Sequence, residues 1–208
     1  MKILFDGVKE FSSIEFKKNK KLFKKLNSEQ KPHTLFIGCS DSRVVPDLIT
    51  KSLPGDLFVI RNIANVVPYY RSSEEYLSTT SAIEYAVLVL NVENIVVCGH
   101  SNCGGCRALF FEDTELEKIP HTKKWIKLFE NVKEKILVIA KNNEKQNDIE
   151  WLVEQENIIE QMNHLLSYPF IKEKYIKGTM NIYGWYYHIG TGKVYNYNKK
   201  NKTFDKIE

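Results

Sequence analysis

The residue types best suited to metal chemistry stand directly after two predicted strands. His100 and Cys103 are three residues apart within the segment 99–103, a spacing at which both side chains can reach one ion. Cys39, which follows another predicted strand, could supply a third ligand. Two thiolates and an imidazole match zinc, and zinc with three protein ligands keeps its fourth position open for water. The pattern therefore predicts a catalytic zinc site rather than a structural one.

A carboxylate and a guanidinium follow Cys39 on the same predicted turn. Asp41 and Arg43 lie two and four residues beyond it. Asp41 could occupy the open metal position, or it could pair with Arg43 and accept a hydrogen bond from metal-bound water. A third interpretation makes Asp41 and Ser42 the N-cap residues of a helix. The residues alone leave these roles open.

The other cysteines and histidines are expected to be structural. Cys98 lies inside the apolar run 95–98, where a buried thiol behaves as a small hydrophobic side chain. Cys106 forms a C-x-x-C with Cys103, which could indicate redox chemistry or a zinc pair. Nothing else in the sequence supports these two interpretations, so Cys106 is expected to pack within a helix. The histidines without ligand spacing are expected on the surface or in the core: His33, His121, His164 and His188.

Short apolar runs alternate with longer amphipathic segments along the chain. The predicted strands span residues 34–38, 57–61 and 94–98, and their apolar runs predict strands buried on both faces of a sheet. A closing β-hairpin is predicted over 180–189 and 193–195. The predicted helices span 8–27, 81–90, 122–141 and 148–167, and another begins near Cys103 or Gly104. This order predicts an α/β fold, a mostly parallel central β-sheet flanked by helices on both faces, with an N-terminal helical arm and C-terminal helices. Such sheets bind ligands at the carboxyl ends of their strands, where both cysteine motifs fall.

The composition is that of an ordinary globular protein with a small-molecule ligand. The chain has 208 residues, of which 43% are hydrophobic and 27% charged, and it predicts a single domain over 1–208 with the arm at 1–30. A formal net charge of +4 is too small for a dedicated nucleic-acid binder. The lysine-rich run 17–25 predicts the solvated face of an amphipathic helix rather than an RNA or membrane patch.

Neither a membrane nor export is expected. No apolar run in the sequence approaches the roughly 20 residues that cross a bilayer. The apolar start of the chain ends at Asp6 and Gly7, too early for the core of a signal peptide. A cytoplasmic location is therefore expected, where the four cysteines would remain thiols.

Two motifs together resemble a known enzyme family. They are Cys39-Ser40-Asp41-Ser42-Arg43 and Gly99-His100-Ser101-Asn102-Cys103-Gly104-Gly105. This pair resembles the signature of the bacterial β-class carbonic anhydrases. Further segments stand in the order of that family, at residues 30–32, 54–58, 61–65, 84–86 and 184–185. The resemblance thus covers most of the chain.

The resemblance implies a zinc ion in each subunit and a defined reaction. Cys39, His100 and Cys103 would bind zinc, and Asp41 with Arg43 would form the catalytic dyad, Asp41 becoming the fourth ligand in a closed state. The reaction would be the reversible hydration of carbon dioxide to bicarbonate and a proton by zinc-bound hydroxide. Zinc lowers the pKa of bound water from 15.7 toward about 7. Asp41, kept ionised by Arg43, would orient that oxygen toward carbon dioxide.

The resemblance also implies a pocket shared between subunits. Gln30, Tyr70 and Tyr85 would line the substrate pocket, partly across a dimer interface. Gly104 and Gly105, at a predicted helix start, could hold a bicarbonate oxygen. A homodimer or homotetramer is therefore expected, with the N-terminal arm wrapping the partner subunit.

A regulatory site of some bacterial members is only partly matched. In those members bicarbonate held by a Trp, an Arg and a Tyr closes the enzyme. Arg61 and Tyr187 match the last two positions, whereas Phe36 stands where the Trp is expected. Phe offers no hydrogen bond, so the sequence does not predict whether bicarbonate inhibits this chain.

Two other functions fit the same residues. A carbon disulfide or carbonyl sulfide hydrolase would need the same attacking hydroxide and the same ligands. A non-catalytic zinc-binding module would keep the fold, but it gives no reason for the presence of Asp41 and Arg43. Comparing turnover of carbon dioxide and carbon disulfide separates the two enzymes.

Overall fold

The computed structural model describes residues 1–72, 77–142 and 149–208. The chain divides into two compact units, Met1–Lys31 and Pro32–Glu208. The division falls just beyond the predicted arm of residues 1–30. Within the described part of the chain, no helix has the length and apolar character needed to cross a membrane.

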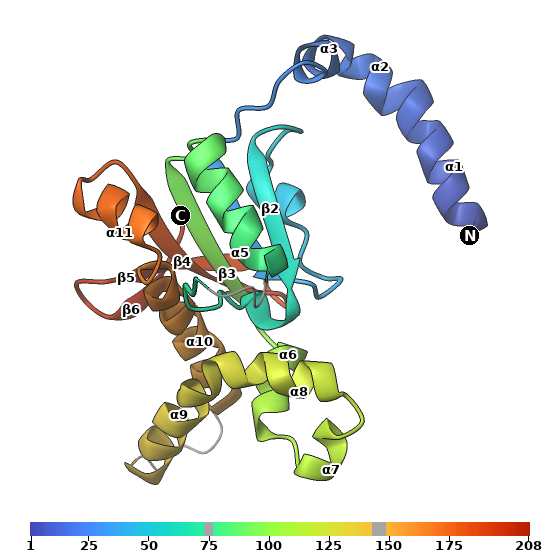
Figure 1. The fold of residues 1–208 in the computed structure, drawn as a ribbon. Helices are drawn as coiled ribbons and strands as arrows, with labels where there is room; N and C mark the ends of the chain where they lie inside the picture. Colours follow the sequence, from blue (N-terminus) through green and yellow to red (C-terminus); the bar gives the residue numbers. More distant parts are fainter. Residues whose placement is uncertain (73–76, 143–148) are drawn as a thin grey trace. The chain divides into compact units, whose positions relative to one another are not determined.

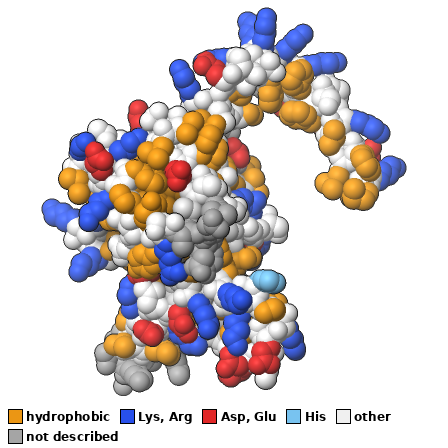
Figure 2. Space-filling model, viewed as in Figure 1, with side chains coloured by type: hydrophobic (Ala, Val, Ile, Leu, Met, Phe, Trp, Pro, Cys, Tyr) orange, Lys and Arg blue, Asp and Glu red, His pale blue; other side chains and the backbone are white. Residues whose placement is uncertain are grey.

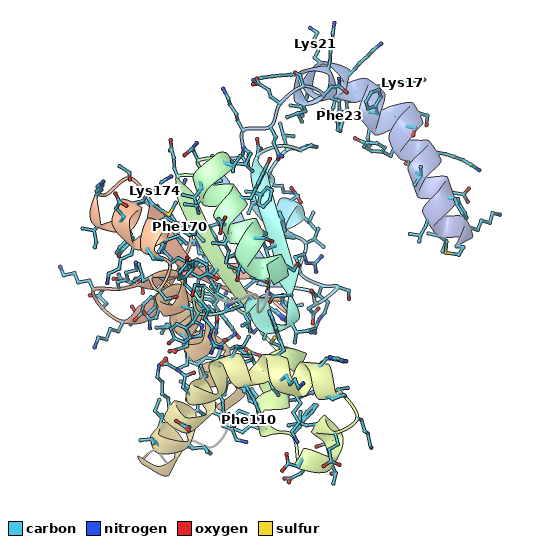
Figure 3. The ribbon with its side chains drawn as sticks, in the orientation of Figure 1. Lys17, Lys21, Phe23, Phe110, Phe170 and Lys174 are labelled. Atoms are coloured by element: carbon cyan, nitrogen blue, oxygen red, sulfur yellow. The ribbon has the colours of Figure 1, made fainter. Side chains whose placement is uncertain are left out.

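The first unit is helical and amphipathic, as the sequence predicts for residues 8–27. It comprises α1 (Lys2–Glu10), a π-helical stretch (Phe11–Glu15), α2 (Phe16–Lys18) and α3 (Lys20–Leu26). Its exposed apolar side chains include Ile3, Leu4, Phe5, Val8, Phe11, Ile14 and Phe16. Figure 2 shows them gathered on one side of the unit and the lysines on the other, and Lys17 and Lys21 extend outward in Figure 3. This unit therefore presents an exposed apolar face.

The second unit is built on a six-stranded sheet in the order β2-β1-β3-β4-β5-β6 (Figure 1). The strands are β1 (Thr34–Cys39), β2 (Leu57–Asn62), β3 (Asn94–His100), β4 (Asn181–His188), β5 (Lys193–Asn198) and β6 (Thr203–Lys206). The first four strands are parallel, and β5 and β6 add antiparallel pairs at one edge. The mostly parallel sheet is thus confirmed. The predicted closing hairpin forms as β4 and β5, and β4 also joins the parallel part of the sheet.

Burial follows position in the sheet. β1 and β3 lie in the interior, and the apolar residues of both are buried on both faces. β2 lies at an edge and is half-exposed, with Val59 39% exposed, so the prediction that it is buried on both faces is wrong. Its apolar run 57–61 looks like that of β1, but an edge strand has a partner on one side only.

Three helical segments cover one face of the sheet and enclose the main core. They are α5 (Leu77–Glu84) with a π-helical continuation (Tyr85–Val89), α10 (Ile149–Leu165) and α11 (Pro169–Ile176). Two glycines let α10 approach the strands closely. A Cβ at Gly99 would lie 2.7 Å from Ile158, and one at Gly184 would lie 2.5 Å from the sulfur of Met162. α10 therefore packs closely against β3 and β4.

The other α-helices of the second unit, among the described residues, are 4 to 13 residues long. They are α4 (Pro46–Thr50), α6 (Gly104–Arg107), α7 (Asp113–Leu116), α8 (Pro120–Ile126) and α9 (Glu130–Asn142). The helix predicted over 122–141 is divided by a 3₁₀ turn at Lys127–Phe129, and the one predicted near Gly104 makes a single turn. All of these elements except α4 contribute to a second cluster that includes Phe129, Val132 and Ile136.

The opposite face of the sheet carries a smaller apolar cluster. Phe36, Val96 and Cys98 are buried there, and the ring of Phe36 meets that of Trp185 edge-on at 6.3 Å. A hollow of about 600 Å³ lies over this face, lined among others by Phe36 and Trp185. Among the described helices that line it, only α4 contributes, through Thr50. The described helices therefore cover mainly the face under α5, α10 and α11, and the other face is covered less than expected.

Candidate active site

Three predicted metal ligands meet at the carboxyl ends of neighbouring strands. Cys39 is the last residue of β1 and His100 the last of β3, and these strands pair in parallel. Cys103 follows one turn later, as the N-cap residue of α6. The ligand atoms of the three side chains all lie within 4.8 Å of one another, and all three residues are buried. The parallel sheet therefore assembles the predicted set.

The geometry of this group fits a tetrahedral cation. The sulfurs of Cys39 and Cys103 are 4.0 Å apart. A tetrahedral zinc ion with its usual sulfur distance would hold two sulfurs about 3.8 Å apart. The ring of His100 bonds the Ser101 carbonyl through Nδ1 at 3.0 Å, while Nε2 is buried without a partner among the described residues. A lone pair on Nε2, fixed by the donor at Nδ1, is the form in which histidine binds metals.

The sulfurs need a cation to ionise. The neighbouring Cys103 sulfur and burial raise the pKa of Cys39 to about 12. The Cys106 sulfur and burial raise the pKa of Cys103 as well. A bound dication reverses this balance, because a coordinating thiol is deprotonated outright. The donor set is therefore matched to a metal ion rather than to free thiolates.

Asp41 and Arg43 are paired beside this group. The Arg43 Nε donates to Asp41 Oδ1 at 2.8 Å, Nη2 donates to Oδ2 at 2.7 Å, and the Arg43 backbone N–H donates to Oδ1 at 3.0 Å. The Arg43 guanidinium holds the pKa of Asp41 well below its usual range. Asp41 Oδ2 lies 4.0 Å from His100 Nε2, so the ionised carboxylate borders the ligand set. The N-cap interpretation of Asp41 and Ser42 is wrong, because the next helix begins at Pro46 with Val45 as its N-cap.

Two further contacts anchor the turn that carries the dyad. Arg43 Nη2 also donates to the Asn102 carbonyl at 3.0 Å, which links the dyad to the turn before Cys103. Arg61, on β2, donates to the Cys39 carbonyl at 3.0 Å and to the Asp41 carbonyl at 2.6 Å. Arg61 therefore clamps the main chain on both sides of Ser40.

The remaining residues of the predicted regulatory site lie on the less covered sheet face. Phe36 is a buried member of a small apolar cluster, and Trp185 and Tyr187 of β4 pack against that cluster. Arg61 uses Nε and Nη2 on the two carbonyls just described. Bicarbonate binding by Phe36, Arg61 and Tyr187 stays a prediction.

The residues predicted to line the substrate pocket lie in different surroundings. Gly105 packs closely, since an added Cβ would lie 2.8 Å from Ala64, whereas Gly104 has open space around its Cα. The ring of Tyr70 contacts Tyr168 and Phe170, and that of Tyr85 contacts Phe58. Gln30 belongs to the N-terminal unit. A substrate role for these residues stays a prediction.

A row of polar residues on α10 was not foreseen from the sequence. Glu154, Asn157, Gln161 and His164 are buried, and each bonds a backbone group of a segment distant in sequence. The bonded groups are the Cys103 N–H, the Ala64 carbonyl, the Val67 N–H and the Val67 carbonyl. Their helical spacing is the signal that could have found them, but on sequence alone such a stripe predicts a solvated face.

The other cysteines and histidines fit structural roles. Cys98 and Cys106 are buried in apolar clusters, and the Cys106 sulfur lies 3.6 Å from the Asn157 amide nitrogen. His164 is fully buried and contacts Glu160 at 3.2 Å. His33 contacts Thr34, and His188 contacts Thr191.

Comparison with known proteins agrees with this geometry. The family model described as carbonic anhydrase matches residues 34–194. A carbonic anhydrase of Helicobacter pylori is 44% identical over 206 residues, covering 98% of this chain and 93% of the relative. A carbonic anhydrase of Synechocystis is 39% identical, covering 95% of this chain and 71% of the relative.

Solved structures give the same assignment. The β-carbonic anhydrase CcaA superposes with a TM-score of 0.93 at 36% identity, covering 100% of this chain and 99% of that one. A tetrameric β-carbonic anhydrase from Sordaria macrospora superposes with a TM-score of 0.80 at 29% identity, covering 93% of this chain and 94% of that one. With its six-stranded sheet and its Cys39, His100 and Cys103 cluster, the chain belongs to the β-class carbonic anhydrases.

Proposed function

We propose that this chain, a carbonate dehydratase by family, catalyses the reversible hydration of carbon dioxide to bicarbonate and a proton with one zinc ion per subunit. Cys39, His100 and Cys103 would hold the ion. The buried Nε2 of His100, which has no hydrogen-bond partner in the described part of the chain, lies beside two sulfurs 4.0 Å apart and supports this assignment. When bound, the metal supplies the Lewis acidity that makes a water molecule nucleophilic near neutral pH.

The residues of the chain then orient the reaction. Asp41 accepts a hydrogen bond from the attacking water, and this bond turns the oxygen lone pair toward carbon dioxide. Arg43 keeps Asp41 ionised and in place through both carboxylate oxygens. The observation that carries the proposal is this pairing next to the ligand set, with Asp41 Oδ2 4.0 Å from His100 Nε2. Because Arg43 engages Asp41, the carboxylate is held for the water rather than for the metal.

The substrate pocket is proposed to be completed by a second subunit. A hollow of about 500 Å³ next to the dyad turn is lined among others by Ser40, Arg61 and Asn62. Gln30, Tyr70 and Tyr85 would add to the pocket in a homodimer or homotetramer, with Gly104 and Gly105 facing a bicarbonate oxygen. The uncovered apolar face of the N-terminal unit and the tetrameric relative from Sordaria macrospora support such an assembly. A cytoplasmic location is part of the same proposal.

The test combines metal analysis with stopped-flow hydration of carbon dioxide. Asp41→Ala should keep zinc and lose most of its turnover, whereas Cys103→Ser should lose zinc itself. Cys106→Ala, which changes a neighbouring buried sulfur, is the matched control and should keep both properties. Near-full turnover of Asp41→Ala would remove the dyad from the mechanism, and stoichiometric zinc in Cys103→Ser would mean that the ligand set is wrong. Turnover of carbon disulfide without carbon dioxide hydration would identify the other enzyme.

A further inference from the structure

A buried carboxylate contacts the main chain of a proposed metal ligand. Glu154, on α10, is only 4% exposed. Its Oε1 accepts the backbone N–H of Cys103 at 2.8 Å, and its Oε2 accepts the hydroxyl of Tyr186 at 2.9 Å. Neither the metal ligands nor the dyad include this residue. Both of its oxygens are nevertheless engaged next to the site.

The bond to Glu154 satisfies the backbone N–H of Cys103, which has no acceptor within α6. Cys103 is the N-cap residue of α6 and has an extended conformation, with φ −73° and ψ 112°. The N–H of such a residue has no acceptor within its own helix. The preceding residue, Asn102, has a φ of 57°, in the left-handed region. Glu154 therefore supplies the acceptor that holds this tight turn in place.

The carboxylate is itself held from two sides. α10 sits tightly on the sheet, because Gly99 and Gly184 leave no room for a side chain beneath it. Tyr186, on β4, donates its hydroxyl to the second oxygen and is 2% exposed. A helix and a strand therefore fix the position of one acceptor, which in turn fixes the N–H of Cys103.

We propose that Glu154 is a positioning residue that sets the direction of the Cys103 sulfur toward the metal through the Cys103 backbone N–H. The inference rests on the proposed zinc site. A carboxylate suits the position because both of its neighbours donate and an ionised carboxylate only accepts. Outer partners of metal ligands of this kind change metal affinity or activity by about 10- to 100-fold when removed.

The closing experiment measures zinc affinity by competition with a chromophoric chelator, and the absorption bands of the cobalt-substituted protein. Glu154→Ala should bind zinc about 10- to 100-fold more weakly and should shift or weaken the cobalt–thiolate bands. Glu154→Gln should lose less than Glu154→Ala, because its amide oxygen can still accept the Cys103 N–H. Glu150→Gln is the matched control. Glu150 and Glu154 both line a cavity of about 140 Å³ next to Cys103. Glu150 is exposed and lies one turn earlier on α10, so this variant should bind zinc normally.

The outcomes separate this inference from the proposed function and from a purely structural role. Wild-type zinc affinity and unchanged cobalt bands in Glu154→Ala would overturn the inference. So would a lower melting temperature of the metal-free protein with the cobalt bands unmoved, since that result describes packing alone. If Glu154→Ala does not fold, Glu154→Gln and Tyr186→Phe carry the same test and should show intermediate losses. A wild-type protein that binds no zinc would instead refute the proposed function.

Discussion

Removing the guanidinium of Arg43 should lower turnover without removing the metal. Arg43→Ala deletes the two side-chain bonds to Asp41, at 2.8 and 2.7 Å, and leaves the backbone bond at 3.0 Å. The side chains of Arg43 and Asp41 are 45% and 18% exposed, so solvent screens the pair. Without these two bonds the Asp41 carboxylate loses its fixed position beside the ligand set. A misplacement of about 1 Å costs about 100-fold in rate, so the expected loss in kcat is about 30- to 100-fold.

The loss should not depend on pH in the working range. The Arg43 guanidinium holds the pKa of Asp41 below its ordinary value of 3.8, and without Arg43 that pKa rises toward the ordinary value. Asp41 therefore stays ionised in both proteins between about pH 6.5 and about pH 9, where hydration would be measured. Arg43→Lys keeps the charge but not the paired geometry, and should lose about tenfold.

The assay is stopped-flow hydration with zinc content determined on the same preparations. Lys123→Ala is the control, because it removes an ion pair of 2.9 Å with Asp113 on the surface and should leave turnover unchanged. Turnover of Arg43→Ala within threefold of the wild type would refute the argument. A loss confined to low pH would also refute it, since Asp41 would then be blocking the metal rather than losing its orientation.

Two further predictions concern the support of the site. Gly184→Ala should lower the free energy of unfolding by about 1–3 kcal/mol, because the new Cβ would crowd the core. That atom would lie 2.5 Å from the Met162 sulfur and 2.8 Å from Ile158, whereas Gly104→Ala has open space and serves as the control in thermal melts. Glu160 is buried beside His164 and Lys135, and these partners lower its pKa from 4.5 to about 2. A carboxylate whose pKa is lowered by folding stabilises the fold at pH values above its pKa in the unfolded chain. About 3 kcal/mol of the free energy of unfolding should therefore be lost as the pH falls from 4.5 to about 2. Acid unfolding of Glu160→Gln should lack this component, and equal pH slopes for both proteins would contradict the assignment.

The grouping of Cys39, His100 and Cys103, which could hold a metal ion, could be predicted because it follows from local sequence and sheet topology. Cys39 and His100 end apolar runs, and parallel strands bring such ends together at one edge. Cys103 comes within reach because the intervening turn is short and Asn102 tolerates a φ of 57°. The dyad follows for the same reason, since Asp41 and Arg43 share a turn with Cys39.

The supporting contacts could not be predicted because they join distant parts of the chain. Glu154 and Cys103 are 51 residues apart, and Arg61 reaches back 20 residues to Asp41. The exposure of β2 was missed for a related reason. Whether an apolar strand lies inside a sheet or at its edge depends on strand order, which the residues of the strand do not record.

The two kinds of support act on different parts of the site. Glu154 connects Cys103 to α10, which also holds the Ala64 carbonyl through Asn157. The dyad turn depends instead on Arg61, from β2, and on the bond from Arg43 to Asn102. A change at Glu154 should therefore weaken metal binding first and turnover only as a consequence. A change at Arg43 should reduce turnover while zinc stays bound, because its side chain reaches the ligand set only through the Asn102 carbonyl, and the Cys103 N–H keeps its own bond to Glu154. Comparing zinc affinity with turnover in the two variants thus tests whether binding the metal and orienting the water are separate functions of this fold.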